Sequence, residues 1–277
     1  MSYNKYIMIP KIVHQTWRSD TLPSVFQNIF DANKEINKDF QFKLWCHTPG
    51  PPDIDEFIKK EYPDIYHIFS RCKYGVQKAD IARLAILHHY GGIYFDLDML
   101  CLKPLDTLIN FDSDDIFLSM EPAEQTQKLF GSDKVLCNAF IAAPPRHPLL
   151  QAALNAIKAL HLKHGDFIYN PFNVFGADLL SHAMTDELYQ KCKFVNRKLV
   201  FPINDPKFTD LPSSVAEGKM LREGQYGEAY IVHYWIHSDF ESKELLEKFA
   251  YDDDKDIHKN VLAFFRELYP SNEHLQV

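Results

Sequence analysis

The chain has 277 residues, of which 46% are hydrophobic and 25% are charged, the balance of an ordinary soluble globular protein that can bury a sizeable core. Its formal net charge of −8 argues against a dedicated surface for nucleic acid or for an anionic membrane. Composition and charge thus indicate a soluble globular protein, and the order of strands and helices along the chain indicates its fold class.

Strands and helices alternate through the first part of the chain. Apolar or alternating runs at 11–17 and 40–45 predict two strands, with a helix over 22–36 between them. Asp53 is expected to cap a further helix that runs to about Lys60. This alternation predicts an α/β fold with a mostly parallel central sheet.

A helix, a double glycine and a strand follow one another between residues 78 and 98. Apolar residues recur with helical spacing before Gly91, which can adopt the left-handed conformation that ends a helix. Gly92 permits a tight turn into a strand that ends in Asp96 and Asp98. Because side chains alternate along a strand, we expect both carboxylates on one face.

The second half has a similar composition and fewer distinctive signals. Strands are predicted at 116–120 and 139–143, a helix over 147–164, and a helix start at 176–180. The remaining predicted elements are strands at 199–202 and 229–235 and helices over 241–249 and 257–269.

Cysteine usage and hydropathy bear on where the protein works. The five cysteines show no Cys-x-x-Cys spacing, so we expect buried, reduced thiols and a cytoplasmic location. The N-terminal residues lack the apolar stretch of a signal peptide, and no apolar run approaches the roughly 18 residues of a membrane-spanning helix. We expect no transmembrane segment and at most peripheral contact with a membrane.

The two aspartates at the predicted strand end suit a metal-dependent reaction on a phosphate ester. Paired carboxylates bind hard divalent cations, and such an ion can bridge a diphosphate and stabilise a departing phosphate oxygen. In open α/β sheets, ligands bind outside the carboxyl ends of strands, where Asp96 and Asp98 are expected. The spacing alone is unspecific, because it recurs in polar loops or helix starts at Asp53/Asp55, Asp112/Asp114, Asp252/Asp254 and Asp254/Asp256.

Several motifs together resemble the DXD-containing sugar transferases of the family 32 type. This family includes initiating and inositol-phosphoceramide mannosyltransferases and capsule-type enzymes, and it is distantly similar to the clostridial glucosylating toxins. The central matches are Ala79-Asp80-x-x-Arg83, Tyr90-Gly91-Gly92-Ile93-Tyr94-x-Asp96-x-Asp98 and Leu102-Lys103-Pro104-Leu105. Further matches are Ile9 to Trp17, Asn138 to Ala142 and His147-Pro148.

The resemblance implies a single GT-A domain over 1–277, with a donor-binding half at about 1–145 and an acceptor side with C-terminal helices at about 146–277. It implies a UDP- or GDP-sugar donor, a Mn²⁺ or Mg²⁺ ion, and retention of anomeric configuration. By the same resemblance, the catalytic residues are Asp80, Arg83, Asp96 and Asp98, the donor-binding residues are Trp17, Tyr94, Asn138 and Ser238, and the metal ligands are Asp98, Asp96 and His233.

Each of these residues also has a purely structural interpretation. Asp80 and Arg83 could form only an i, i+3 surface pair, and Trp17 and Tyr94 could be core aromatics. Asn138 could satisfy backbone groups at the start of a strand.

The match to the family weakens toward the C-terminus. The family's segment His-x-Trp-x-x-Ser-Trp is represented by His233 through Asp239, with Asp239 in place of the second tryptophan. His233 and Ser238 could complete the metal or phosphate site, or His233 could be a hydrogen-bonded histidine within a strand. Ala177 replaces the proline that usually follows Gly176, which leaves Asp178 as a doubtful acceptor-side residue.

The sequence thus predicts a retaining, metal-dependent glycosyltransferase that acts on a hydroxyl of a glycan, lipid or protein. Arg83 would stabilise the departing diphosphate, whose oxygen is a plausible base. Glu121, just after a strand, is the weak candidate for a covalent nucleophile or for acceptor binding. The alternatives are a nucleotide-sugar hydrolase or nucleotidyltransferase with the same metal site, and a non-catalytic carbohydrate-binding protein.

Overall fold

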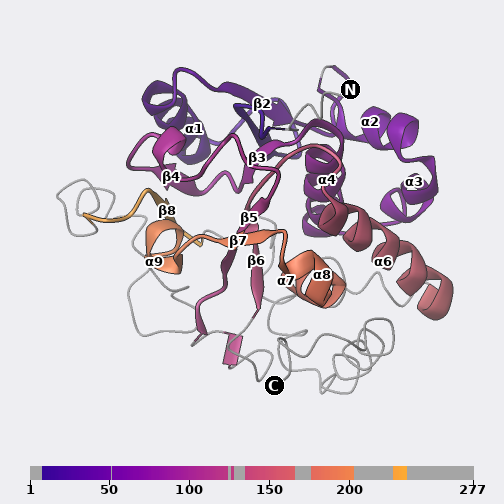
Figure 1. Cartoon of the computed structure of the whole chain (residues 1–277). Helices are drawn as coiled ribbons and strands as arrows, with labels where there is room; N and C mark the ends of the chain where they lie inside the picture. The colour runs from indigo at the N-terminus through magenta and orange to yellow at the C-terminus, as the bar shows by residue number, and fades with distance from the viewer. Residues whose placement is uncertain are drawn as a thin grey trace, which may run out of the picture.

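The structure is a computed structural model that describes residues 8–50, 52–123, 126–127, 135–165, 176–202 and 227–235. Figure 1 shows these residues as a central sheet with helices packed around it. The predicted C-terminal helices and Ser238 lie outside the described residues. None of the helices in the described ranges combines the length and apolarity that crossing a bilayer requires.

The strands and helices follow the predicted alternation. The strands are β1 (Ile12–Thr16), β2 (Gln41–Trp45), β3 (Gly92–Phe95), β4 (Met99–Cys101), β5 (Ile116–Met120), β6 (Leu136–Ala143), β7 (Cys192–Phe194) and β8 (Ile231–His233). The helices are α1 (Ser24–Ile36), α2 (Ile54–Glu61), α3 (Pro63–Phe69), α4 (Gly75–Tyr90), α6 (Pro148–His164), α7 (Ala177–Ala183), α8 (Asp186–Tyr189) and α9 (Arg197–Val200), with a short 3₁₀ turn at Leu105–Thr107.

The central sheet has six strands in the order β2-β1-β3-β6-β5-β7. β1 pairs in parallel with β2 and β3, and β5 pairs in parallel with β7, whereas β6 runs antiparallel between β3 and β5. The sheet is mixed, with parallel pairings in the majority, as predicted. The carboxyl ends of β1, β2 and β3 therefore share one edge, and the residues that follow these strands meet there.

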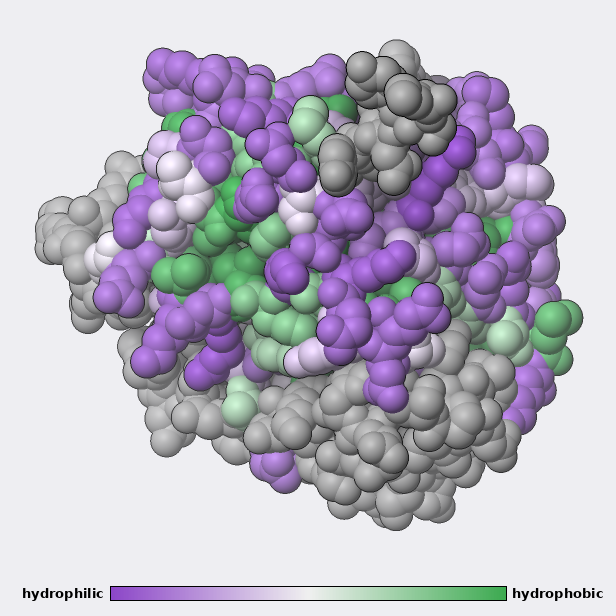
Figure 2. All heavy atoms as spheres, in the orientation of Figure 1, coloured by the Kyte–Doolittle hydropathy of each residue, from purple (hydrophilic) through white to green (hydrophobic). Residues whose placement is uncertain are grey.

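The sheet separates two hydrophobic clusters, because alternate residues of β3 point to opposite faces. Tyr94 belongs to the cluster that packs against α2, α3, α4, α6 and α7. Ile93 and Phe95 belong to the other cluster, with β4, α9 and β8. Figure 2 shows hydrophilic side chains over most of the described surface on one face, with an apolar area toward the left of centre.

The double glycine joins α4 to β3 under tight packing. Gly91 has φ 64° and Gly92 has φ 100°, and both values favour glycine. A Cβ atom at Gly92 would lie 2.5 Å from the carbonyl oxygen of Ile12, and one at Gly91 would lie 2.6 Å from the ring of Pro145. The turn therefore needs glycine both for its backbone conformation and for space.

His14 supports this turn from β1. Its Nε2 donates to the carbonyl oxygen of Gly91 at 3.0 Å, and its Nδ1 accepts from Trp45 Nε1 at 3.1 Å. Burial lowers the pKa of His14 to about 3, so the ring is neutral and both nitrogens are used.

The structure corrects two predictions. Asp96 and Asp98 do not end a strand, because β3 stops at Phe95 and a turn follows, in which Met99 N–H donates to the Asp96 carbonyl oxygen at 3.1 Å. The predicted strand at 199–202 is wrong, since α9 occupies 197–200 and the Asn196 side chain caps it. A short apolar run does not distinguish a strand from a helical turn, and here the cap decides.

Other local predictions are confirmed. Asp53 caps α2 by accepting from Glu56 N–H at 3.0 Å, and the helix predicted over 147–164 is α6. All five cysteines are free and buried, and burial raises the pKa of the Cys72 thiol to about 12. The short α3 and β7 are additions that the sequence patterns did not predict. The division of the chain near residue 145 stays a prediction.

Candidate active site

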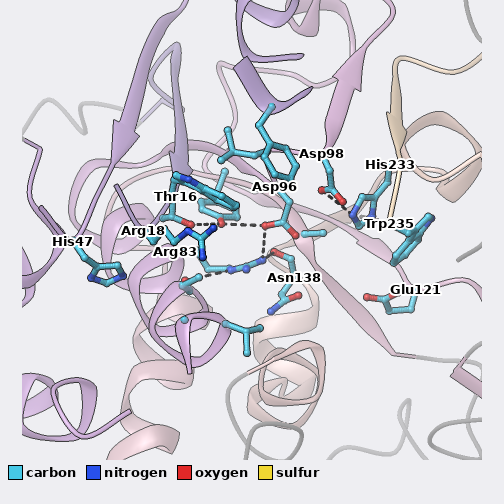
Figure 3. Close-up of a pocket in the computed structure, with 18 residues that line it drawn as sticks. Thr16, Arg18, His47, Arg83, Asp96, Asp98, Glu121, Asn138, His233 and Trp235 are labelled. Atoms are coloured by element: carbon cyan, nitrogen blue, oxygen red, sulfur yellow. Dashed lines mark hydrogen bonds and ion pairs between the residues drawn. The ribbon is translucent and has the colours of Figure 1, made fainter. Parts of the chain in front are cut away.

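A cavity of about 250 Å³ with both polar and apolar walls lies at the carboxyl ends of β1 and β3. Its walls come from the ends of these strands, the start of α4, the β3–β4 turn, β6 and β8. Figure 3 shows His47 at one side, Arg83, Asp96 and Asn138 in the middle, and Asp98, His233, Trp235 and Glu121 at the other side. Of the predicted site residues, the cavity wall includes Trp17, Arg83, Tyr94, Asp96, Asp98, Glu121, Asn138 and His233.

Arg83, Asp96 and Asn138 line the middle of the cavity and are joined by Asp80, which is not among the residues of the cavity wall. We call Asp80, Arg83, Asp96 and Asn138 the clamp. Arg83 Nη2 lies 3.2 Å from Asp80 Oδ1, and Arg83 Nη1 lies 3.3 Å from Asp96 Oδ1. Arg83 Nη1 also donates to the Asn138 carbonyl oxygen at 2.7 Å, and Asn138 Nδ2 donates to Asp80 Oδ1 at 2.8 Å. Asp80 and Arg83 form a buried pair and not the surface pair that the sequence left open.

Burial and charge oppose each other at Arg83. The residue is only 5% exposed, and burial acts to lower its pKa. The nearby carboxylates of Asp96 and Asp80 outweigh this effect and raise the pKa above its ordinary value. Burial raises the pKa of Asp96, while Arg83 acts in the opposite direction. The guanidinium therefore stays positive and holds two carboxyl groups in fixed positions.

Tyr94 connects the clamp to β1. Its hydroxyl donates to Asp96 Oδ1 at 3.1 Å and lies 2.9 Å from Thr16 Oγ1. The Arg83 guanidinium lies 4.5 Å from the centre of the Tyr94 ring, which is a cation–π contact. The side chain is almost completely buried, so Tyr94 is a core aromatic whose hydroxyl orients a site residue.

The other end of the cavity holds a group that could bind a metal ion. Asp96, Asp98 and His233 each offer one ligand atom, and these atoms lie within 4.8 Å of one another. We call these residues the metal corner. Two carboxylates and one imidazole are ligands that suit Mn²⁺ or Mg²⁺ better than a soft ion.

His233 reaches the metal corner through a second, small sheet. β8 pairs antiparallel with β4 and places His233 opposite Met99, one residue after Asp98. His233 Nε2 lies 3.2 Å from Asp98 Oδ1, and Tyr234 N–H donates to the Asp98 carbonyl oxygen at 3.0 Å. Burial opposes the charge on His233, but Asp98 raises its pKa overall. The Nδ1 atom is buried with no hydrogen-bond partner.

An aromatic side chain, Trp235, and an acidic one, Glu121, flank the metal corner. The Trp235 ring lies 3.9 Å from the His233 ring, centre to centre, and its φ of 55° is uncommon for a residue other than glycine. Glu121 is buried and lines the cavity after β5. Trp235 matches the first tryptophan of the family's C-terminal segment, but it was not among the predicted site residues.

The side of the cavity nearest α1 contains Trp17 and Arg18. Trp17 is 9% exposed, its ring lies 4.9 Å from the Phe26 ring, and the Arg18 guanidinium lies 5.4 Å from its centre. The indole Nε1 is buried with no partner. Trp17 therefore combines the predicted cavity position with core packing, and its stacking on a base stays a prediction.

His47 is a cavity residue that the sequence reasoning missed. It follows β2 by two positions, so it comes to the same edge of the sheet as Trp17 and Asp96. The rule that ligands bind beyond the carboxyl ends of parallel strands could have identified it.

Two predicted residues remain without a described side chain. Ser238 lies outside the described residues, and the structure describes the backbone of Asp178 in α7 but not its side chain. Gly176, just before α7, lies beside the clamp, since a Cβ atom there would be 3.7 Å from Asp80 Oδ2.

A family model described as "Glycosyltransferase sugar-binding region containing DXD motif" matches residues 23–114, which include Asp80, Arg83, Asp96 and Asp98. An uncharacterized glycosyltransferase of Acanthamoeba polyphaga mimivirus is 30% identical over 65% of this chain and 66% of its own length. The chain belongs to this DXD-containing family.

Other members of the DXD-containing family are longer than this chain. Inositol phosphoceramide mannosyltransferase 1 of Schizosaccharomyces pombe is 30% identical over 68% of this chain and 52% of its own. Mannosyl phosphorylinositol ceramide synthase of Saccharomyces cerevisiae is 34% identical over 54% of this chain and 35% of its own. The chain therefore spans about half, or less, of the length of these relatives.

The solved structure of PaToxG glycosyltransferase resembles this fold over most of both chains. The match covers 95% of this chain and 89% of that one, with a TM-score of 0.50 and 15% sequence identity. At this identity the likeness concerns the fold, and it confirms the predicted GT-A class.

Proposed function

We propose that this DXD-family protein is a retaining, metal-dependent glycosyltransferase that moves a hexose from a UDP- or GDP-sugar to an acceptor hydroxyl. The observation that carries the proposal is that Asp96 belongs both to the clamp and to the metal corner, within one cavity. A nucleotide sugar needs both: hydroxyl-binding groups for its sugar and a cation for its diphosphate.

The metal corner would hold Mn²⁺ or Mg²⁺ through Asp96, Asp98 and His233. Such an ion supplies positive charge to the two phosphates when it is bound. His233 comes to this point with Nε2 3.2 Å from Asp98 Oδ1, so a ring nitrogen lies close enough to the carboxylates to share an ion with them.

The clamp would bind the transferred sugar and limit its motion. Asp80 and Asp96 are carboxylates that accept hydrogen bonds from sugar hydroxyls, and Arg83 fixes both of them. The buried positive charge of Arg83 also favours the negative charge that develops as the diphosphate departs. Such preorganised groups need no rearrangement during the reaction.

Retention of configuration follows if the acceptor hydroxyl attacks the face from which the diphosphate leaves. The hydroxyl oxygen forms the new bond to the anomeric carbon, the bond to the phosphate oxygen breaks, and the proton passes to that oxygen. Glu121 is the carboxylate to test as an acceptor-binding group or as a nucleophile, because it lines the cavity beside the metal corner.

The names of the relatives supply the first substrates to test. Two of them are named as enzymes that mannosylate inositol phosphoceramide or synthesise its mannosylated form. We therefore propose mannose as the first donor sugar, with a glycan, a lipid headgroup or a protein hydroxyl as acceptor.

The direct test is turnover of a nucleotide sugar in Mn²⁺ by wild-type protein and by Asp98→Asn. We expect at least a 100-fold loss in Asp98→Asn, because an amide is a poor ligand for a divalent ion. Asp112→Asn is the matched control, since Asp112 belongs to an exposed Asp-x-Asp pair. Equal activity of Asp98→Asn and wild type would refute the proposal, and free sugar as the sole product would indicate a hydrolase.

A further inference from the structure

His47 is held in one orientation by three elements that meet at the cavity. It follows β2, and its Nδ1 lies 2.6 Å from Asp55 Oδ2 in the first turn of α2. Lys78, in the first turn of α4, lies 3.8 Å from the other carboxylate oxygen of Asp55.

The contacts of the ring leave one edge for a ligand. The ring of Phe69 lies nearly parallel to His47, at 6.0 Å between centres, and covers one face. The Nδ1 edge faces Asp55, and the side chain is 22% exposed and lines the cavity. The Nε2 edge is therefore the polar part of His47 that a bound molecule can reach.

The position of His47 identifies the part of the ligand that it meets. Figure 3 shows it across the cavity from Asp98 and His233, with Arg83 between them. In the proposed function, the diphosphate of a nucleotide sugar lies at the metal corner and its sugar lies at the clamp. The nucleoside would then occupy the side of the cavity that His47 lines. Trp17 lines that side as well and offers a flat apolar ring.

We propose that His47 selects the nucleobase by accepting a hydrogen bond from a ring N–H, an inference that rests on the proposed glycosyltransferase function. In the tautomer that donates from Nδ1 to Asp55, Nε2 carries no hydrogen and is an acceptor. Uracil and guanine carry a ring N–H at their pairing edge, whereas cytosine and adenine carry a bare acceptor nitrogen there. Two facing acceptors leave a buried lone pair unsatisfied, so the site favours UDP and GDP over CDP and ADP.

Asp55 is a positioning residue in this scheme, because it acts through His47. Its carboxylate cannot donate to Nδ1, so it keeps the proton on that nitrogen. Lys78 holds the carboxylate in turn. Removal of Asp55 should therefore weaken the discrimination between bases, and this readout would not change if Asp55 only stabilised α2.

Calorimetric binding of UDP, CDP, GDP and ADP to the full chain in Mn²⁺ tests the inference. We expect wild-type protein to bind UDP at least about 10-fold more tightly than CDP, or GDP than ADP. His47→Phe keeps a ring against Phe69 and should reduce this ratio to about 2-fold or less. His47→Gln should reduce it by raising CDP affinity, because an amide can turn either its oxygen or its nitrogen toward the base.

Two further variants control the experiment. Asp55→Ala should lower the base ratio, and His67→Phe, at an exposed histidine of α3, should leave it unchanged. Equal binding of all four nucleotides by wild type, or a ratio unchanged in His47→Phe and His47→Gln, would overturn the role of His47 and leave the proposed function intact. If none of the four bound in Mn²⁺, the proposed function would fail and this inference with it.

Discussion

The clamp and the metal corner share Asp96 but differ in how their polar groups are satisfied. In the clamp, Arg83 faces Asp80, Asp96 and a backbone carbonyl, and Asn138 closes the ring of contacts. In the metal corner, His233 approaches Asp98 with one nitrogen, and its other nitrogen has no partner. The carboxylates of the clamp face the permanently charged Arg83, whereas Asp98 in the metal corner faces the titratable His233.

This difference has a physical consequence for stability and function. Buried charges that pair within the protein contribute to the fold, and removal of one member leaves the others uncompensated. A buried group without a partner costs stability until a ligand satisfies it. We therefore expect clamp variants to lose stability and metal-corner variants to lose affinity for the cation.

The largest expected effect comes from Arg83→Leu. The substitution leaves the carboxyl groups of Asp80 and Asp96 without their cation, and we expect the free energy of unfolding to fall by about 3–5 kcal/mol. Urea denaturation at pH 7 measures this loss. Arg71→Leu, at an exposed arginine, should change stability by no more than about 0.5 kcal/mol. Equal losses in both variants would show that the clamp does not support the fold.

A second prediction concerns the turn that sets the clamp against β3. Gly92→Ala should lower the free energy of unfolding by about 3 kcal/mol, the upper end for a strained backbone, because its Cβ must also displace the Ile12 carbonyl oxygen. Gly50→Ala is the matched control, with φ 134° but nothing within 4 Å of the added atom. Thermal denaturation compares the two, and a smaller loss in Gly92→Ala than in Gly50→Ala would contradict the steric argument.

The pH dependence of stability tests the support of this turn by His14. Between pH 6.5 and about 3, the unfolded chain binds a proton at His14 that the folded chain excludes, so stability falls as the pH falls through this window. At pH 5 the expected loss from His14 is about 2 kcal/mol. Urea denaturation from pH 7 to 5 measures it.

Two variants isolate the contribution of His14 to that slope. His14→Gln should be less stable at pH 7 but should show a flatter decline toward pH 5, because the residue no longer titrates. His67→Gln, at an exposed position, should decline as wild type does. An unchanged slope in His14→Gln would assign the acid sensitivity to other groups, such as His147, whose pKa burial lowers to about 4.

The smallest expected effect belongs to the metal corner. His233→Phe keeps a ring against Trp235 and Phe201 but removes the ligand nitrogen. We expect affinity for Mn²⁺, titrated in the presence of UDP or GDP, to fall about 10-fold or more, which corresponds to about 1.4 kcal/mol. Stability without the metal should fall by less than in Arg83→Leu, because the substitution removes the partner of one carboxylate and not of two. A loss of stability as large as in Arg83→Leu, with normal affinity for Mn²⁺, would show that His233 supports the fold and does not bind the cation.

Much of the clamp could be predicted because its parts are close in the sequence. The spacing of Asp80 and Arg83 places them on one helix face, and the glycine pair requires a turn before β3. The cap at Asp53 was predicted for the same reason, since a cap depends on the next two or three residues. Residues 96–98 were predicted as the end of a strand but form a turn. The turn arises because Met99 N–H donates to the Asp96 carbonyl oxygen instead of pairing with a neighbouring strand.

The sequence by itself determined the elements that carry the site: a helix with Asp80 and Arg83 on one face, a glycine turn, and two aspartates after an apolar strand. Only the tertiary structure decided that β8 brings His233 to Asp98 and that α2 and α4 together fix His47 through Asp55 and Lys78. The reason is the range of the interactions involved. Helical spacing, caps and glycine turns depend on neighbours along the chain, whereas strand pairing and contacts between elements depend on how the whole core packs.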